Sequence, residues 1–173
     1  AVNVSSLNLC MKNLIGFLLS FVILPIAAQT VSEDITIYRD GYGVPHIHGK
    51  TDKDVAYGLA WAHSEDDFNT IQHTFLPSKG LMGLYGGKDG VIMDYLVVLL
   101  RCRETANAHY KDLSKEVLEV IEGYVEGINA YAKAHPDEVL VKNSFPMSVM
   151  DYLTGYNLVI HFFSDTGDVL GEI

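Results

Sequence analysis

Cysteine is nearly absent from this sequence, which holds two in 173 residues, Cys10 and Cys102. Cys10 precedes the export signal described below, so an exported chain keeps only Cys102 and forms no internal disulfide. Cys102 lies between two arginines, which can lower the pKa of a thiol, but no nucleophile motif surrounds it. The sequence therefore favours a buried, small apolar role for Cys102 over a catalytic one.

Basic residues are also scarce, with 12 Lys and Arg against 22 Asp and Glu and a formal net charge of −10. Proteins that bind nucleic acid neutralise phosphates with basic side chains, so we expect no nucleic-acid partner. The composition is 49% hydrophobic and 20% charged, which is typical of a globular protein and argues against disorder.

Motifs that carry a complete catalytic mechanism are missing. The sequence contains no Gly-x-Ser-x-Gly elbow, no His-Glu-x-x-His helix and no phosphate-binding glycine loop. The glycines between positions 80 and 90 follow no predicted strand and precede no Lys-Ser or Lys-Thr pair. Short motifs alone therefore assign no reaction.

No apolar run is long enough to cross a membrane comfortably, and the longest extends from Leu14 to Ile26. It follows Met11-Lys12-Asn13 and ends at Ala27-Ala28, the pattern of a secretory signal peptide. We therefore expect a signal peptide at 11–28, a non-native upstream segment at 1–10, and a periplasmic or secreted protein without a stable membrane anchor.

Hydrophobic periodicity predicts a small strand pair followed by helices. Ile35–Tyr38 alternates as a strand does, residues 40–45 supply turn chemistry, and His46–His48 forms a second strand. Thr51 is a predicted N-cap, and Pro77 and Gly80 end the first helix. Further segments are a glycine-rich loop with one helical turn at 81–85, and helices at 92–110, 114–135 and 150–163. The first half of the helix at 92–110 is so apolar that we expect it to be buried.

Two clusters of polar residues resemble metal ligands. His46 and His48 share one face of their strand and could bind a metal with a third group, although exposed rim residues are the more common case. His63 with Glu65, Asp66 and Asp67 also has the composition of a ligand set. A polar face, either solvated or between segments, is the more common explanation of this second cluster.

A third candidate lies at 165–168, where Asp165-Thr166-Gly167-Asp168 could offer oxygen ligands to calcium. The segment lacks the spacing of a twelve-residue calcium loop, which favours an ordinary acidic turn.

Three longer blocks resemble the penicillin acylase family, which includes acyl-homoserine lactone acylases. They are IYRDGYGVPHI at 37–47, DVAYGLAWAHSED at 54–66, and GYVEGINAY at 123–131. The blocks occur in the family's order, and the resemblance extends from about 35 to 163. The family commonly has Asp-Arg where this chain has Asp66-Asp67, so the ion pair of that arginine is in doubt here.

The resemblance implies an α+β fold: the mostly helical α-chain portion of a four-layer αββα N-terminal-nucleophile hydrolase, with a short strand pair at its start. Residues 31–173 would form a truncated α-chain domain. In such enzymes a serine at the amino terminus of a separate β chain attacks the substrate, so we assign no catalytic residue to this chain and expect it to be inactive alone. The implied substrate is a small N-acyl amide of the penicillin or acyl-homoserine lactone type, and the implied partner is the β chain of the same precursor.

The resemblance also implies two binding features. In the family the last α-chain helix forms one wall of the acyl pocket, and Phe162 and Phe163 occupy the matching stretch. Ordinary core aromatics are the alternative for both. A structural calcium is bound shortly after this helix, where Asp168 is the nearest match, and no organic cofactor is implied.

A second function remains open: a non-catalytic secreted fragment that binds an acyl chain or calcium. Producing residues 29–173 alone distinguishes the two. We expect aggregation, because the apolar segment at 92–100 needs a partner surface.

Overall fold

The computed structural model describes residues 29–32 and 34–164. The predicted signal peptide, the upstream segment and Asp168 lie outside them. Within these residues the chain forms a small antiparallel sheet of order β1-β2-β3, with strands β1 (Gln29–Ser32), β2 (Ile35–Arg39) and β3 (Pro45–His48). The predicted pair is thus confirmed as β2 and β3, and β1 adds a strand on the other side of β2.

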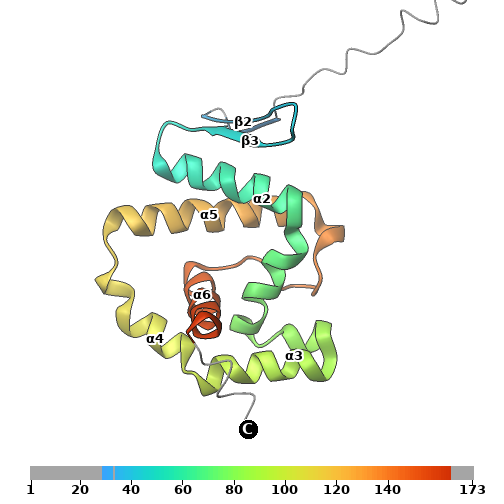
Figure 1. Cartoon of the computed structure of the whole chain (residues 1–173), viewed down its shortest axis with the longest axis vertical. Helices are drawn as coiled ribbons and strands as arrows, with labels where there is room; N and C mark the ends of the chain where they lie inside the picture. The colour runs from blue at the N-terminus through green and yellow to red at the C-terminus, as the bar shows by residue number, and fades with distance from the viewer. Residues whose placement is uncertain (1–28, 33, 165–173) are drawn as a thin grey trace, which may run out of the picture.

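The helices that follow lie below the sheet in Figure 1. Their bounds are α2 (Asp52–Phe75), α3 (Met82–Leu99), α4 (Cys102–His109), α5 (Lys115–Ala134) and α6 (Val149–Phe163), with short 3₁₀ turns η1 (Pro77–Lys79), η2 (Tyr110–Asp112) and η3 (Pro136–Glu138). Across these described segments, no helix is long and apolar enough to cross a membrane.

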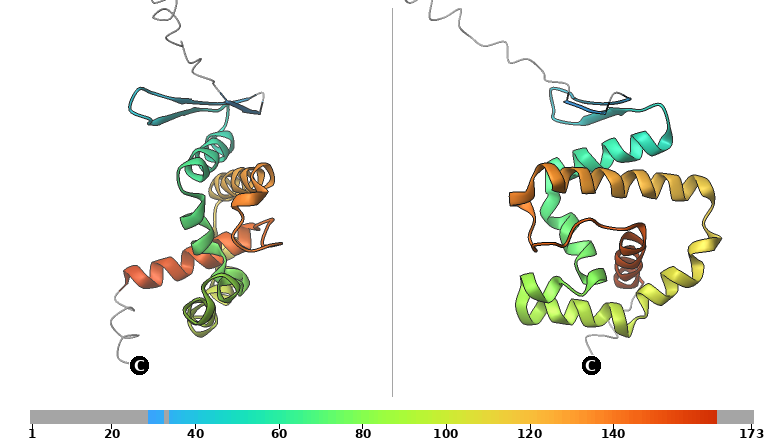
Figure 2. Two further views of the ribbon diagram at one scale, coloured as in Figure 1. Left: turned by 90° about the vertical axis from the view of Figure 1, so that its right-hand side faces the viewer. Right: turned by 180° about the vertical axis from the view of Figure 1, so that it is seen from behind.

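Helix α2 is the centre of the fold, because the sheet packs on one of its sides and α5 on the other (Figures 1 and 2). The alternating burial of β2 turns Ile35 and Ile37 towards α2. Trp61 and Phe68 of α2 meet Tyr131 of α5 edge to face, with ring centroids 5.4 and 5.0 Å apart. Such contacts add to the hydrophobic burial that holds the core together.

The two layers approach α2 closely because small residues face them. A Cβ atom added at Gly58 would lie 2.6 Å from Ile47 of the sheet. On α5, a Cβ at Gly123 would lie 2.2 Å from the carbonyl oxygen of Lys53, and one at Gly127 would lie 2.4 Å from that of Tyr57. The glycines of the second and third sequence blocks therefore set the spacing between the layers.

Two expectations about the middle of the chain are wrong. The glycine-rich stretch at 83–90 is helical, and only Gly87, at φ 59°, interrupts α3. The Asp94 carboxylate accepts the backbone N–H groups of Met82 and Gly83, both at 2.9 Å. Asp94 therefore caps the first turn of α3 although it lies in a later turn of the same helix. The predicted helix at 92–110 is divided at Arg101, whose φ of 55° ends α3 and starts α4.

The expected burial of the apolar segment at 92–100 is also only partly correct. Leu96 and Val97 are buried against Cys102 and Leu158. The opposite face of α3 is open, with its large apolar side chains between 44% and 75% exposed: Leu84, Tyr85, Val91, Ile92, Tyr95, Val98 and Leu99. Among residues 29–32 and 34–164, helix α3 packs against its neighbours on one side only, so the hydrophobicity of the segment predicted more burial than these residues supply.

Candidate functional site

Helix α6 carries the sequence-predicted pocket residues, and its start is fixed by a capping box. Ser148 is the N-cap, and its hydroxyl accepts the backbone N–H of Asp151 at 3.1 Å. The Asp151 carboxylate in return accepts the Ser148 N–H at 3.0 Å and its hydroxyl at 2.7 Å. These bonds satisfy amide groups that a helix otherwise leaves without partners.

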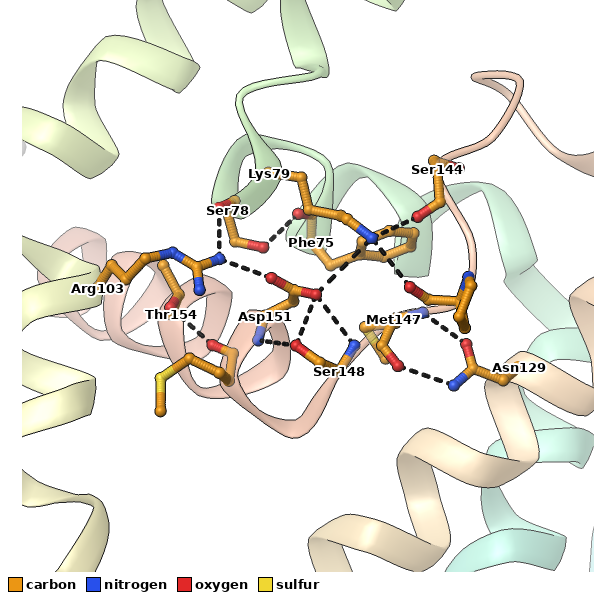
Figure 3. A network of polar contacts seen from close by, with 12 residues as sticks. Phe75, Ser78, Lys79, Arg103, Asn129, Ser144, Met147, Ser148, Asp151 and Thr154 are labelled. Carbon is orange, nitrogen blue, oxygen red and sulfur yellow. Dashed lines mark hydrogen bonds and ion pairs between the residues drawn. The ribbon is translucent and has the colours of Figure 1, made fainter.

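Asp151 also joins α6 to two other segments (Figure 3). Its carboxylate lies 2.6 Å from the guanidinium of Arg103 on α4 and 3.7 Å from the Lys79 ammonium in η1. Lys79 further donates to the carbonyl oxygens of Ser144 and Pro146, at 2.7 and 2.9 Å, in the loop before α6. One carboxylate, with its side chain only 10% exposed, thus orients the helix relative to η1, α4 and that loop.

The electrostatics of Asp151 follow from this network. Burial raises the pKa of its carboxyl group, but the hydrogen bonds from Ser148 and Arg103 and the charge of Lys79 outweigh burial and hold the pKa below its ordinary value. Asp151 is therefore ionised at neutral pH and serves as an anchor, not as a general acid.

Asn129 fixes the loop on the other side. Its side-chain amide donates to the Met147 carbonyl oxygen at 2.8 Å and accepts the Met147 N–H at 2.7 Å (Figure 3). This residue belongs to the third sequence block, so the asparagine of that motif positions the residue directly before the Ser148 cap.

Replacing Asn129 by alanine is expected to destabilise the fold by about 2 kcal/mol, because both backbone groups of Met147 lose their partner while partly buried. The free energy of unfolding, followed by the fluorescence of the single tryptophan in dilute solution, measures the loss. Asn107→Ala, at an exposed position of α4, is the matched control and should leave stability unchanged. Equal values for both variants would contradict the role given to Asn129.

A cavity of about 180 Å³ lies beside α6, between it and helices α2 and α5. Buried apolar side chains form its floor, and exposed polar residues of α2 and a tyrosine of α6 form its rim. At the rim the Nδ1 atom of His63 lies 2.8 Å from the hydroxyl of Tyr124. Burial, followed by the neighbouring Tyr152, raises the pKa of Tyr124 to about 12, so its hydroxyl stays protonated. The full lining is His63, Thr70, Ile71, Thr74, Phe75, Tyr124, Ile128, Met147, Tyr152, Gly155, Tyr156 and Val159.

The two predicted pocket phenylalanines lie in the last turn of α6 and do not line this cavity. Phe162 is 43% and Phe163 is 86% exposed, so neither is a core aromatic of this chain. Their assignment to an acyl pocket stays a prediction, as does the assignment of calcium to Asp168.

The suggested ligand cluster around His63 is separated by the structure into three structural contacts. His63 bonds Tyr124, Asp66 pairs with Arg39 at 2.9 Å, and Asp67 accepts the Thr70 N–H at 3.1 Å. Asp67 has non-helical backbone angles, φ −156° and ψ 62°, and restarts α2 after a kink. At the position where the family commonly has an arginine, this chain therefore has a capping residue.

The two histidines of β3 and Cys102 are not arranged as a metal or catalytic site. His46 and His48 are both exposed, and His46 lies 3.3 Å from the Asp40 carboxylate. Among the described residues no group of three or more potential ligands is placed to hold a metal. Cys102 is fully buried and unpaired, and burial raises the pKa of its thiol, which confirms the small apolar role.

Arg39 is a key residue that motif spacing did not single out. Its guanidinium donates to the carbonyl oxygens of Gly43, at 3.0 Å, and Ala62, at 3.2 Å, and pairs with Glu65 at 3.1 Å. It thus ties the hairpin of the first sequence block to the helix of the second. The sequence signal for this contact was that the first block, which contains Arg39, and the second block, which contains Glu65, occur together in one chain.

The structure resembles a thermostable penicillin G acylase from Alcaligenes faecalis with a TM-score of 0.58 and 21% identity, over 76% of this chain and 74% of that one. The two proteins therefore share a fold, a mostly helical chain that begins with a small antiparallel sheet, and the expected α+β class is confirmed. The penicillin amidase family model matches residues 34–159, and the chain belongs to that family.

Curated relatives agree with this assignment. An acyl-homoserine lactone acylase PvdQ from Pseudomonas savastanoi pv. phaseolicola is 30% identical over 134 residues, covering 68% of this chain and 17% of that protein. The penicillin G acylase of Escherichia coli is 28% identical over 122 residues, covering 69% and 14%. This chain thus spans about a sixth of the length of these relatives, whose names describe acylases, and its family membership supports an amide hydrolase.

Proposed function

We propose that this chain is the α-chain region of a secreted or periplasmic acylase that hydrolyses small N-acyl amides, of the penicillin or acyl-homoserine lactone type. The observation that carries the proposal is α6. Its start is held by the ion pairs of Asp151 with Arg103 and Lys79 and by the bonds of Asn129 to the preceding loop, while its last turn presents two exposed phenylalanines. A rigid helix with an exposed aromatic end suits a pocket wall that another segment completes, since acyl pockets are mainly hydrophobic.

In the proposed reaction the nucleophile is a serine at the amino terminus of a β chain, outside this sequence. Its hydroxyl attacks the amide carbonyl while its own α-amine takes the proton, and the amine product leaves as the acyl-enzyme forms. Water then releases the carboxylic acid. The role of this chain is to bind the acyl group through Phe162 and Phe163. A structural calcium held with the help of Asp168 belongs to the same proposal.

The open face of α3 is consistent with a partner chain. Monomeric soluble proteins rarely expose contiguous apolar patches of this kind, and such patches usually mark an interface. The relatives are about six to seven times as long as the part that they share with this chain, which leaves ample sequence to cover that face.

The first test is the coding sequence beyond Ile173 and the enzyme that it encodes. We expect a spacer, a cleavage junction followed by serine, and amidase activity in the processed protein. Phe163→Ala in that protein should raise KM for an acyl substrate about tenfold with a smaller change in kcat, because a pocket wall contributes binding. Tyr42→Ala, at a 96% exposed turn position, is the control. A processed protein without amidase activity would refute the proposal.

The second test is production of residues 29–173 alone, which we expect to aggregate through the open face of α3. Replacing Val91, Tyr95 and Val98 together by lysine should restore solubility, whereas lysines at the exposed positions Asn69, Thr70 and Thr74 of α2 should not. Light scattering and sedimentation measure both. A soluble wild-type monomer that binds an acyl chain or calcium would favour the non-catalytic alternative.

A further inference from the structure

The cavity between α2, α5 and α6 has a buried apolar floor. Ile71, Phe75, Ile128 and Met147 are between 1% and 6% exposed and together close its inner end. Water is held poorly on such a surface, because a buried water needs two to four polar partners. An engineered apolar cavity of roughly 150 Å³ stays dry and accepts benzene. The volume here, about 180 Å³, therefore fits a single six-membered ring.

One wall of the same cavity is aromatic. The rings of Tyr124 and Tyr152 have centroids 5.6 Å apart, and those of Tyr152 and Tyr156 lie 6.1 Å apart and parallel within 7°. Aromatic rings attract one another at centroid distances of about 4.5–7 Å. A planar ring in the cavity can continue this series of tyrosines, whereas a flexible alkyl group or a saturated ring cannot.

The rim supplies a polar anchor. His63 is exposed there, and its Nδ1 atom is engaged by the Tyr124 hydroxyl at 2.8 Å. That bond fixes the orientation of the imidazole and leaves Nε2 as the nitrogen that can bond a ligand. A buried apolar floor with one polar pair at its mouth is the usual design of a small-molecule site.

We infer that this cavity binds a small aromatic ring that carries one hydrogen-bonding group, and phenol is the simplest probe. The ring lies on the floor beside the tyrosines, and its hydroxyl bonds the His63–Tyr124 pair. The site goes beyond the proposed amide hydrolysis, because it requires no catalytic group and is not lined by Phe162 or Phe163.

Calorimetric titration of the chain, in its soluble lysine variant of α3 if the wild type associates, measures the binding. We expect one saturable site for phenol with a Kd of roughly millimolar order, as its few atoms allow. Toluene lacks the hydroxyl and cyclohexanol lacks the aromatic face, and each should bind roughly three- to tenfold more weakly, since one hydrogen bond or ring contact contributes that much. Equal affinities for all three would overturn the assignment.

Two variants locate the site. Val159→Phe adds a ring to a lining position and should weaken phenol binding by more than about tenfold. Circular dichroism checks that this variant stays folded. Leu84→Phe, at a 75% exposed position of α3, is the matched control and should bind phenol as before. Equal losses in both variants, or none in either, would contradict the location.

A third variant tests the anchor. His63→Ala should abolish the preference for phenol over toluene and leave the affinity for toluene unchanged. Because the assay involves no turnover, an absence of phenol binding would leave the proposed hydrolase intact, and an inactive hydrolase would leave this site intact. Binding that disappears when the chain is joined to the rest of a longer precursor would show that another segment fills the cavity, which would overturn the inference.

Discussion

Replacing Gly127 by valine is expected to unfold this chain or to cost more than about 3 kcal/mol of stability, because the new side chain has no space between α5 and α2. A Cβ atom there would lie 2.4 Å from the Tyr57 carbonyl oxygen and 2.8 Å from the Cβ of Ala60. The first contact is with backbone, so no rotamer change relieves it. The helices would have to separate, and the buried Trp61 and Phe68 would lose their contacts with Tyr131.

Trp61 provides the measurement, since it is the only tryptophan in the sequence and is 8% exposed. Urea unfolding in dilute solution, followed by its fluorescence, gives the change in free energy. The control is Gly86→Val in α3, where an added Cβ would have only the end of Met82 within 4 Å, at 3.8 Å. This variant should keep nearly the stability of the wild type. A Gly127→Val protein as stable as the control would show that the two helices are not held at the described distance.

Replacing Asp151 by alanine is expected to cost about 3–5 kcal/mol, since it removes the helix cap and leaves Arg103 and Lys79 without their shared carboxylate. The Lys115–Glu119 pair supplies the control, because both of its side chains are far more exposed and such pairs contribute little. Glu119→Ala should therefore leave the unfolding midpoint unchanged. Comparable losses in the two variants would mean that Asp151 acts as an ordinary surface charge.

The same carboxylate should make stability depend on pH. The pKa of Asp151 is lower in the folded chain than its ordinary value near 3.9. Its contribution is therefore complete above that ordinary value and is lost as the pH falls through the lower, folded-state pKa. In acid the wild type should lose more stability than Asp151→Asn, which lacks this contribution at every pH. Parallel pH curves for the two proteins would contradict the predicted shift.

The sequence was most informative where local rules decide the structure. Alternation predicted β2, and the Thr51 cap was located correctly, because capping depends on residues three positions apart. The glycines of α3 led to the wrong prediction of a loop, because the helix there depends on Asp94, whose carboxylate accepts the N–H groups of Met82 and Gly83. No pattern of neighbouring residues reveals such a contact.

The candidate site shows the same division. The resemblance placed Phe162 and Phe163 at the end of the last helix, but it could not show that Asn129, Lys79 and Arg103 hold the start of that helix. It also gave no sign of the cavity beside α6, because the residues of its lining come from three helices and a loop that are far apart in the chain.

By itself, then, the sequence determined the family and most helix boundaries of this protein, since the three motif blocks, the caps and the periodicity depend on residues close together in the chain. Only the tertiary structure decided which apolar faces are covered. The hydrophobicity of the segment at 92–100 predicted burial, yet burial depends on which surfaces meet, and within the described part of the chain α3 meets its neighbours on one side only. The tertiary structure likewise explains why glycine is required at positions 123 and 127 of α5. The backbone of α2 lies so close to them that a side chain would not fit.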